Sequence, residues 1–267
     1  VQKKDLPFFM SLMEKLNQKK IICPRPLKDS KGKHLSKIKN KPASIVTFLS
    51  GSDKTNLNYK NCFDIGRNIA KFHKVTSKIK LYRENSMSIK KLDGLLKSIK
   101  VKSNKISSKL KPTLNMCLKD IKSQWPKKLP SGIIHGDLFI DNIFFNKNKF
   151  SGFIDFYFSS NDYLMYEIAI CINALCFDKK RNYFKMNYKK VKNLIDGYET
   201  LRHFTKKEKD ALNILCRGAA LRYLLTRIYD YFNTPKTALI QIKDPNEYFQ
   251  KLIFHNNLNN YKDYYKQ

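Results

Sequence analysis

Two short apolar segments joined by a polar turn constrain the fold of this chain more than any other feature. The first, GIIHGDLFIDNIFF, covers residues 132–145, and the second, FSGFIDFYF, covers residues 150–158. Short apolar runs on both sides of a polar turn are typical of paired β-strands. Such a pair would bring three oxygen-bearing side chains to one place in the fold: Asp137, Asn142 and Asp155.

The spacing of these side chains matches what phosphoryl transfer needs. Asp137 and Asn142 are five residues apart, as in the catalytic loop of protein kinases, and Asp155 follows 13 residues later. The reaction needs a carboxylate that accepts or orients the hydroxyl proton, and oxygen ligands that hold Mg²⁺ against the phosphates of ATP. We therefore predict that Asp137 is the catalytic base and that Asn142 and Asp155 bind Mg²⁺.

The two acidic tripeptides also have a simpler explanation. His135-Gly136-Asp137 could be a tight turn, and Ile154-Asp155-Phe156 could be the end of a strand. That explanation would suffice for either tripeptide alone. Both together, in this order and with Asn142 at the right offset, favour a catalytic site. We expect His135 to pack against the loop and hydrogen-bond it, since Asp137 already supplies the base.

Apolar spacing predicts one hairpin and several helices around this loop. The segments 33–38 and 43–49 flank Asn40 and Pro42 and predict a β-hairpin, because the second is β-branched and apolar. The stretch 78–106 is polar and weakly periodic, which indicates a loop with room for one short helix. Helices are expected at 5–19, 59–77, 107–124, 162–177, 182–199, 205–231 and 245–261. The fold class is therefore α+β, with a helix and a hairpin ahead of a larger, mainly helical part.

Composition excludes a disordered polycation and a small disulfide scaffold. The chain has 53 Lys plus Arg against 22 Asp plus Glu, a net charge of +31, yet 42% of its residues are apolar. The lysines lie in polar segments without interleaved arginines and aromatics, which indicates a solvated surface and argues against nucleic acid as a partner. No run reaches the roughly 18 apolar residues of a membrane span. Six cysteines without a CxxC pair fit reduced thiols in a soluble, cytoplasmic protein.

Several segments of the chain also resemble a known family. The chain resembles the small-molecule kinases of the aminoglycoside and choline phosphotransferase superfamily and, within it, the bacterial homoserine kinases. The segments that carry the resemblance are DLPFFMSLMEKL (5–16), CPRPLKDSKGK (23–33), PASIVTFLSG (42–51), GIIHGDLFIDNIFF (132–145), SGFIDFYFSSNDYLMYEIAICINALCF (151–177) and RGAALRYLLTRIYD (217–230).

This resemblance implies a protein-kinase-like fold of two lobes. Residues 1–50 would form a partial N-lobe on the nucleotide side, and residues 51–267 a C-lobe with the catalytic loop. The reaction would be transfer of phosphate from ATP, with Mg²⁺, to the hydroxyl of L-homoserine, giving O-phospho-L-homoserine for threonine synthesis. Phe48 and Leu49 would lead into the hinge that binds adenine. Glu14 would pair with the lysine that holds the α- and β-phosphates, or else be a surface residue.

The chain departs from the family pattern at three points. The glycine-rich loop and the strand lysine should lie upstream of Val1, so we expect a chain truncated at its N-terminus that holds nucleotide phosphates poorly. Asp155-Phe156-Tyr157 lacks the glycine of the protein-kinase motif, which argues for a small-molecule kinase. Glu167 stands where relatives usually have Asp, at a position that braces the catalytic loop.

A zwitterionic acceptor needs an acid for its ammonium and a base for its carboxylate. Asn161 and Asp162 follow the metal strand closely enough to line the acceptor pocket, although Asp162 could equally be the N-cap of helix 162–177. Arg222, in an apolar stretch, is the arginine expected to point inward, toward the acceptor carboxylate or into a structural ion pair. It is spaced by five residues from two others, so the three cannot share one helix face: Arg217, Arg222 and Arg227.

Two other functions fit parts of the sequence. One is a kinase of the same fold that acts on choline, ethanolamine, methylthioribose, hydroxylysine or an aminoglycoside. A strongly basic chain disfavours polycationic aminoglycosides, while its tyrosines keep choline open. The other is a catalytically inactive, kinase-like binding protein that contacts RNA through lysines. The intact Asp137, Asn142 and Asp155 argue against it, whereas the missing glycine-rich phosphate loop argues for it.

Overall fold

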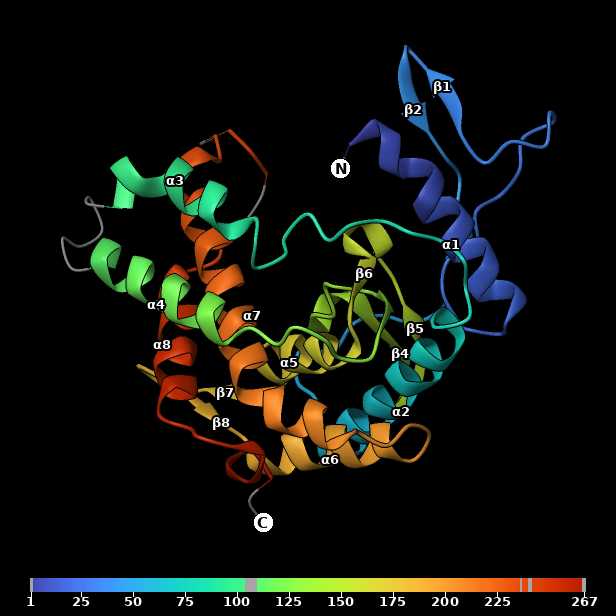
Figure 1. Cartoon of the computed structure of the whole chain (residues 1–267). Coiled ribbons are helices and arrows are strands. Elements are labelled where there is room, and N and C mark those ends of the chain that lie inside the picture. The colour runs from blue at the N-terminus through green and yellow to red at the C-terminus, as the bar shows by residue number, and fades with distance from the viewer. Residues whose placement is uncertain (1, 104–109, 236, 240–241, 266–267) are drawn as a thin grey trace.

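The structure, a computed structural model, describes residues 2–103, 110–235, 237–239 and 242–265 (Figure 1). Its helices are α1 (Leu6–Gln18), α2 (Tyr59–Thr76), α3 (Leu92–Ser103), α4 (Leu110–Gln124), α5 (Leu164–Leu175), α6 (Tyr188–Glu199), α7 (Lys206–Asn233) and α8 (Pro245–Asn256). Its strands are β1 (Ser36–Ile38), β2 (Lys41–Ala43), β3 (Ser131–Ile134), β4 (Ile143–Asn146), β5 (Lys149–Phe153), β6 (Ser160–Tyr163), β7 (Phe177–Lys179) and β8 (Phe184–Met186). They form four antiparallel pairs in the described part of the chain: β1–β2, β3–β6, β4–β5 and β7–β8.

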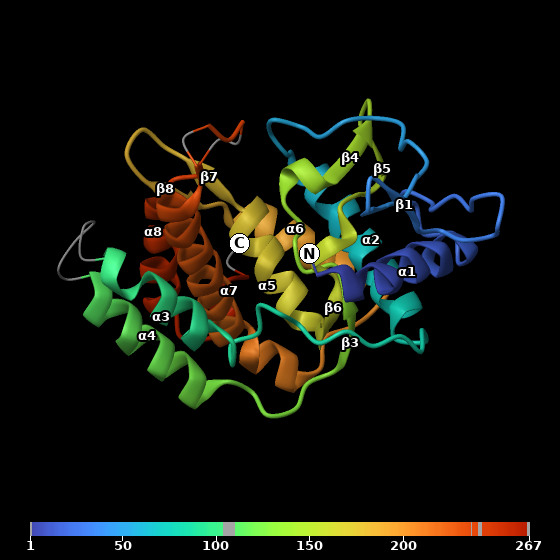
Figure 2. The ribbon, with the colours of Figure 1, turned by 90° about the horizontal axis from the view of Figure 1, so that it is seen from above.

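The elements are arranged around a central group of strands. In Figure 1, α1 and the β1–β2 hairpin lie on one side of the β3–β6 and β4–β5 pairs, and α3, α4, α7 and α8 lie on the other. Seen from above in Figure 2, α5 lies between α7 and the central strands. α5 is buried along almost its whole length, which explains its continuously apolar sequence. The strands that carry the catalytic motif therefore rest on a buried helix.

Side-chain caps fix the starts of the two longest helices. α2 begins with a reciprocal pair, in which the backbone N–H of Asn61 donates to Asn58 Oδ1 at 2.8 Å and the backbone N–H of Asn58 donates to Asn61 Oδ1 at 3.3 Å. α7 begins with the same device, since the hydroxyl of Thr205 accepts from the backbone N–H of Glu208 at 3.2 Å. Both caps occur in the sequence as a polar residue three positions before its partner.

α2 and α6 approach each other more closely than side chains allow. A Cβ atom on Gly66 would lie 2.0 Å from the carbonyl oxygen of Leu194, and a Cβ on Gly197 would lie 2.0 Å from the carbonyl oxygen of Phe63. Each glycine therefore leaves the space that the backbone of the other helix occupies.

The N-terminal hairpin is shorter than predicted. Lys39 and Asn40 both have positive φ, at 47° and 61°, and form a two-residue turn that pairs residues 36–38 with 41–43. The segment 44–49 was wrongly predicted to belong to this hairpin. It pairs instead with the chain before it, where the backbone N–H of Thr47 donates to the carbonyl oxygen of Arg25 at 2.9 Å.

The stretch 78–106 contains one helix, as predicted, but α3 has 12 residues and is longer than expected; residues 104–106 lie outside the described part of the chain. Two more predictions of local structure were wrong. The helix predicted from residue 162 begins at Leu164, because residues 160–163 pair with β3. The helix predicted at 182–199 begins only at Tyr188, because β7 and β8 form a hairpin before it; the side chain of Asn187 caps its start. Short strands with few apolar residues give too weak a periodicity to be seen in the sequence.

The remaining helices α1, α2, α4 and α7 confirm the sequence prediction to within a few residues, although residues 107–109 of the predicted helix 107–124 lie outside the described part of the chain. α8 starts where predicted but ends at Asn256, five residues before the predicted end. Among the described residues, no helix is both long enough and apolar enough to cross a membrane.

Candidate active site

The catalytic motif lies in a loop between β3 and β4. Gly136 has a φ of 78°, and a Cβ there would lie 2.9 Å from the carbonyl oxygen of Phe158, so the loop needs glycine at this point. Asp155 follows β5 and has a left-handed backbone, with a φ of 60°. A non-glycine residue in that conformation is uncommon and is found at functional sites more often than elsewhere.

Hydrogen bonds join the three predicted site residues. The Asn142 side-chain amide donates to the carbonyl oxygen of Asp137 at 2.8 Å and lies 3.3 Å from its carboxylate. The backbone N–H of Ile154 donates to the carbonyl oxygen of Asn142 at 3.0 Å, which holds the neighbouring Asp155 beside the loop. Because the Nδ2 of Asn142 is used in this way, its Oδ1 remains for another partner.

These three residues line one cavity of about 640 Å³, so the structure brings them together as predicted. α7 forms one wall. The cavity is lined by Met87, Leu95, Asp137, Phe139, Asp141, Asn142, Asp155, Phe158, Arg222, Tyr223, Thr226, Arg227, Tyr229, Asp230, Thr234, Ile242 and Lys243.

Asp137 lies at the buried end of this cavity. The hydroxyl of Tyr223 lies 3.3 Å from its Oδ1 and 3.1 Å from the carbonyl oxygen of Gly136, and can donate to either. Burial raises the pKa of the Asp137 carboxyl, while the positive charge of Arg222 and the Tyr223 hydroxyl act in the opposite direction. A carboxyl group with a raised pKa is a better proton acceptor than an ordinary aspartate.

Glu167, on α5, braces the catalytic loop from below. Its buried carboxylate accepts from the backbone N–H of His135 at 2.5 Å and from that of Gly136 at 2.9 Å. Burial opposes ionisation, but the His73 side chain, 3.6 Å away, and the loop donors outweigh it, so the pKa of Glu167 is lowered. His73 is itself held at 2.8 Å from the hydroxyl of Tyr198. The charge of Glu167 thus fixes two consecutive backbone groups just before Asp137.

His135 occupies the structural position that the sequence predicts. Its Nε2 lies 2.8 Å from the carbonyl oxygen of Ile154, to which it donates, and its ring packs 4.7 Å from that of Phe156. The histidine therefore links the catalytic loop to the strand that carries Asp155.

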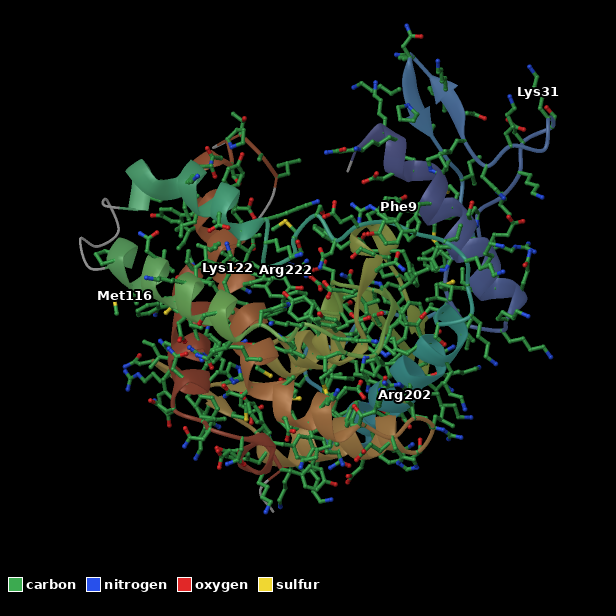
Figure 3. The ribbon with its side chains drawn as sticks, in the orientation of Figure 1. Phe9, Lys31, Met116, Lys122, Arg202 and Arg222 are labelled. Atoms are coloured by element: carbon green, nitrogen blue, oxygen red, sulfur yellow. The ribbon has the colours of Figure 1, made fainter. Side chains whose placement is uncertain are left out.

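Arg222 is the arginine that points inward. It is 2% exposed, its guanidinium lies 4.7 Å over the ring of Tyr223, and Figure 3 shows it near the centre of the molecule. Its Nε is buried and has no hydrogen-bond partner in the described part of the chain. The other two arginines are paired: Arg217 with Asp120 on α4, and Arg227 with Glu247 at 2.7 Å.

The other two predicted acceptor residues lie outside the cavity lining. Asn161 accepts, through its Oδ1, from the backbone N–H of Arg83 at 2.9 Å. Asp162 accepts from the side-chain amide of Asn85 at 2.6 Å. Asp162 is not an N-cap either, because it lies in β6 and Tyr163 holds that position without a side-chain cap.

The residues predicted on the nucleotide side lie beside α1 and in the segment after β2. The carboxylate of Glu14 lies 3.0 Å from Nε2 of His34 and 3.5 Å from Nζ of Lys28, which lower its pKa. The side chain of Phe48 is 90% exposed. Leu49 is half-buried, and its Cδ2 would lie 2.9 Å from a Cβ placed on Gly152.

Sequence reasoning missed most of the α7 wall. Tyr223, Thr226 and Asp230 line the cavity together with the predicted Arg222. Their spacing of three and four residues was visible as one helix face, but only the packing of α7 reveals which face meets the loop.

Comparisons with known proteins agree with this site. A family model described as the phosphotransferase enzyme family matches residues 1–204. The chain is 41% identical to homoserine kinase from Sinorhizobium medicae over 94% of its length and 76% of the relative's, and 39% identical to homoserine kinase from Agrobacterium fabrum over 99% and 81%. Among solved structures it is similar to choline kinase from Cryptosporidium parvum, with a TM-score of 0.64 at 17% identity over 100% of this chain and 83% of that one. An amicoumacin kinase gives a TM-score of 0.66 at 11% identity over 89% and 74%.

The structural matches show the fold, which is the α+β, mostly helical fold of these kinases. The sequence matches are much closer and extend over nearly the whole chain. The chain therefore belongs to the phosphotransferase enzyme family and, within it, to the homoserine kinases.

Proposed function

We propose that this protein transfers the γ-phosphoryl group of ATP to the hydroxyl of L-homoserine, giving O-phospho-L-homoserine and ADP. The observation that carries the proposal is the meeting of Asp137, Asn142, Asp155 and the unpaired Arg222 in one cavity, in a chain about 40% identical to homoserine kinases. The product would serve threonine biosynthesis.

In the proposed reaction, Asp137 accepts the proton of the acceptor hydroxyl as its oxygen attacks the γ-phosphorus. The new O–P bond forms while the bond from the γ-phosphorus to the β–γ bridging oxygen breaks, and ADP leaves with that electron pair. Tyr223 orients the carboxylate of Asp137 through its hydroxyl.

Asn142 and Asp155 fit Mg²⁺, whose charge would neutralise the β- and γ-phosphates. Both offer oxygen donors, and the Asp155 carboxylate has no hydrogen-bond or ion-pair partner among the residues described. No group of three or more His, Cys, Asp or Glu side chains that could hold a metal occurs in that part of the chain. A cation held by one amide, one carboxylate and the substrate phosphates agrees with the habits of Mg²⁺, which keeps few protein ligands.

Arg222 is the proposed ligand of the acceptor carboxylate. The buried guanidinium is near the charge of Asp137 and hydrogen-bonds Tyr166, but its Nε has no acceptor in the described part of the chain, and a bidentate carboxylate would supply one. The same cation disfavours acceptors with positive charge and no carboxylate, such as choline or aminoglycosides. The inactive binding protein is disfavoured because each of the three reaction residues keeps its place in the cavity.

On the nucleotide side, Phe48 and Leu49 are proposed to hydrogen-bond adenine through their backbone. Neither residue uses its backbone N–H or C=O in a hydrogen bond with another described residue. Glu14 remains the proposed partner of a phosphate-binding lysine, a role for which it would exchange its present contacts with His34 and Lys28.

The proposal is tested by ³¹P NMR of Mg-ATP consumption by the protein, with L-homoserine, choline and kanamycin in separate samples. A phosphomonoester signal with homoserine alone is the expected result. Turnover of another acceptor alone would show a kinase of the same fold with a different substrate. Unchanged ATP in all samples would favour the catalytically inactive binding protein.

Replacing Tyr223 should change the pH dependence of the reaction. Asp137 must be ionised to accept a proton, so kcat/KM falls as pH drops through its pKa. The Tyr223 hydroxyl favours the ionised form, so Tyr223→Phe should raise that pKa further and move the acid limb to higher pH. kcat/KM measured between about pH 5 and pH 9 gives the limb directly. Tyr231→Phe, at an exposed tyrosine of the same helix, is the control, and an acid limb that stays in place in Tyr223→Phe would contradict the contact.

A further inference from the structure

Three of the seven charged residues in the cavity lining form ion pairs with other residues in the described part of the chain. Lys243 pairs with Asp141 at 3.3 Å, and Arg227 pairs with Glu247 at 2.7 Å. Asp137 and Asp155 are reserved for the proton and for Mg²⁺ in the proposed function. Two lining residues of opposite charge are left without an ion-pair partner in the described part of the chain: Arg222 and Asp230.

Asp230 shares with Asp155 the lack of a partner in the described part of the chain, but it lies outside the catalytic motif. Its side chain has neither a hydrogen bond nor an ion pair with any described residue, although it borders the cavity. Partial burial raises the pKa of the Asp230 carboxyl, and no neighbouring cation offsets the lost hydration. Asp230 is an exposed residue that borders the cavity, and no cation among the described residues forms an ion pair with it.

The position of Asp230 on α7 suits a ligand that starts at Asp137. Tyr223 contacts Asp137, and Asp230 lies seven residues further along α7, almost two full turns, so both project from the same side of the helix. Seven residues correspond to a rise of about 10 Å. A hydroxyl and an ammonium separated by four bonds are about 5 Å apart, and a hydrogen bond of about 2.8 Å at each end brings the total to about 10 Å.

We propose that Asp230 binds the ammonium group of the acceptor and so selects an amino acid over the corresponding hydroxy acid. The inference rests on the proposed function and adds to it a specificity-determining residue. Arg222 and Asp230 then meet the carboxylate and the ammonium of one zwitterion, with the hydroxyl directed at Asp137.

The test compares L-homoserine with 4-hydroxybutyrate, which has the same chain, hydroxyl and carboxylate but no ammonium. In the unaltered protein, kcat/KM should favour homoserine. Asp230→Asn should lower kcat/KM for homoserine by about 10- to 100-fold, mainly through KM, and change that for 4-hydroxybutyrate by less than about threefold. Asp210→Asn, the same change at an exposed position near the other end of α7, should alter neither.

Each other outcome has a definite meaning. If Asp230→Asn lowers kcat/KM equally for both acceptors, Asp230 has a structural role. If it leaves kcat/KM unchanged for both, Asp230 does not belong to the acceptor site. Either result overturns the inference while the proposed function stands. If the unaltered protein phosphorylates neither homoserine nor 4-hydroxybutyrate but does phosphorylate another alcohol, the proposed function itself fails.

Discussion

Asp137→Asn should lower kcat by at least about 10³-fold, because it removes the group that accepts the proton in the transition state. The asparagine has the same shape and can still accept from the Tyr223 hydroxyl, so the fold and the binding of ATP should be kept. A buried carboxyl with a raised pKa also contributes no stability through its charge, so the midpoint of thermal unfolding should shift by only a few degrees.

Two measurements check this result together. Single-turnover phosphorylation reports the chemical step, and calorimetric titration with ATP reports binding. Asp210→Asn serves again as the control for the loss of one negative charge. A variant that keeps more than about a tenth of the activity would show that Asp137 orients the hydroxyl without accepting its proton.

Glu167→Ala should destabilise the protein by about 3 to 5 kcal/mol, because it leaves two buried N–H groups without an acceptor. Glu167→Gln keeps the size of the side chain but can accept from only one of the two donors, since its amide nitrogen faces the other. It should therefore cost less stability, about 1 to 3 kcal/mol. In both variants the catalytic loop loses its support just before Asp137, so kcat should also fall by at least about tenfold where the protein is still folded.

Denaturant unfolding at neutral pH gives the stability of each variant, and kcat is then measured well below the unfolding midpoint. Glu199→Gln, at a partly exposed carboxylate of α6 that also accepts a backbone N–H, is the matched control. If Glu167→Gln were as stable and as active as the unaltered protein, the carboxylate would not be what holds the loop.

The reaction residues could be predicted from the sequence because their relation is local. Asp137, Asn142 and Asp155 lie within 19 residues, and the short strands between them leave few ways to arrange the loop. Arg222 could be predicted to point inward because its neighbours along the chain are apolar. The structural role of His135 was predicted from the motif itself, and that of Glu167 from the family resemblance; the loop contacts of both agree with these predictions.

The acceptor side could not be predicted because it depends on contacts distant in sequence. Asn161 and Asp162 follow Asp155 closely, but hydrogen bonds to Arg83 and Asn85, nearly 80 residues earlier, hold them away from the cavity lining. Asp230 shares a helix face with Tyr223, yet its role becomes visible only when the packed structure shows which charges are already paired.

The direct backbone contact between α2 and α6 limits how this protein can move. His73 lies on α2 and Tyr198 on α6, and their hydrogen bond connects the helix pair to Glu167 beneath the catalytic loop. Because the backbones of α2 and α6 are in contact at Gly66 and Gly197, sliding or rotation of either helix alone would cause a steric clash between the two backbones. The two helices can therefore move only as one unit, together with the support they give to Glu167.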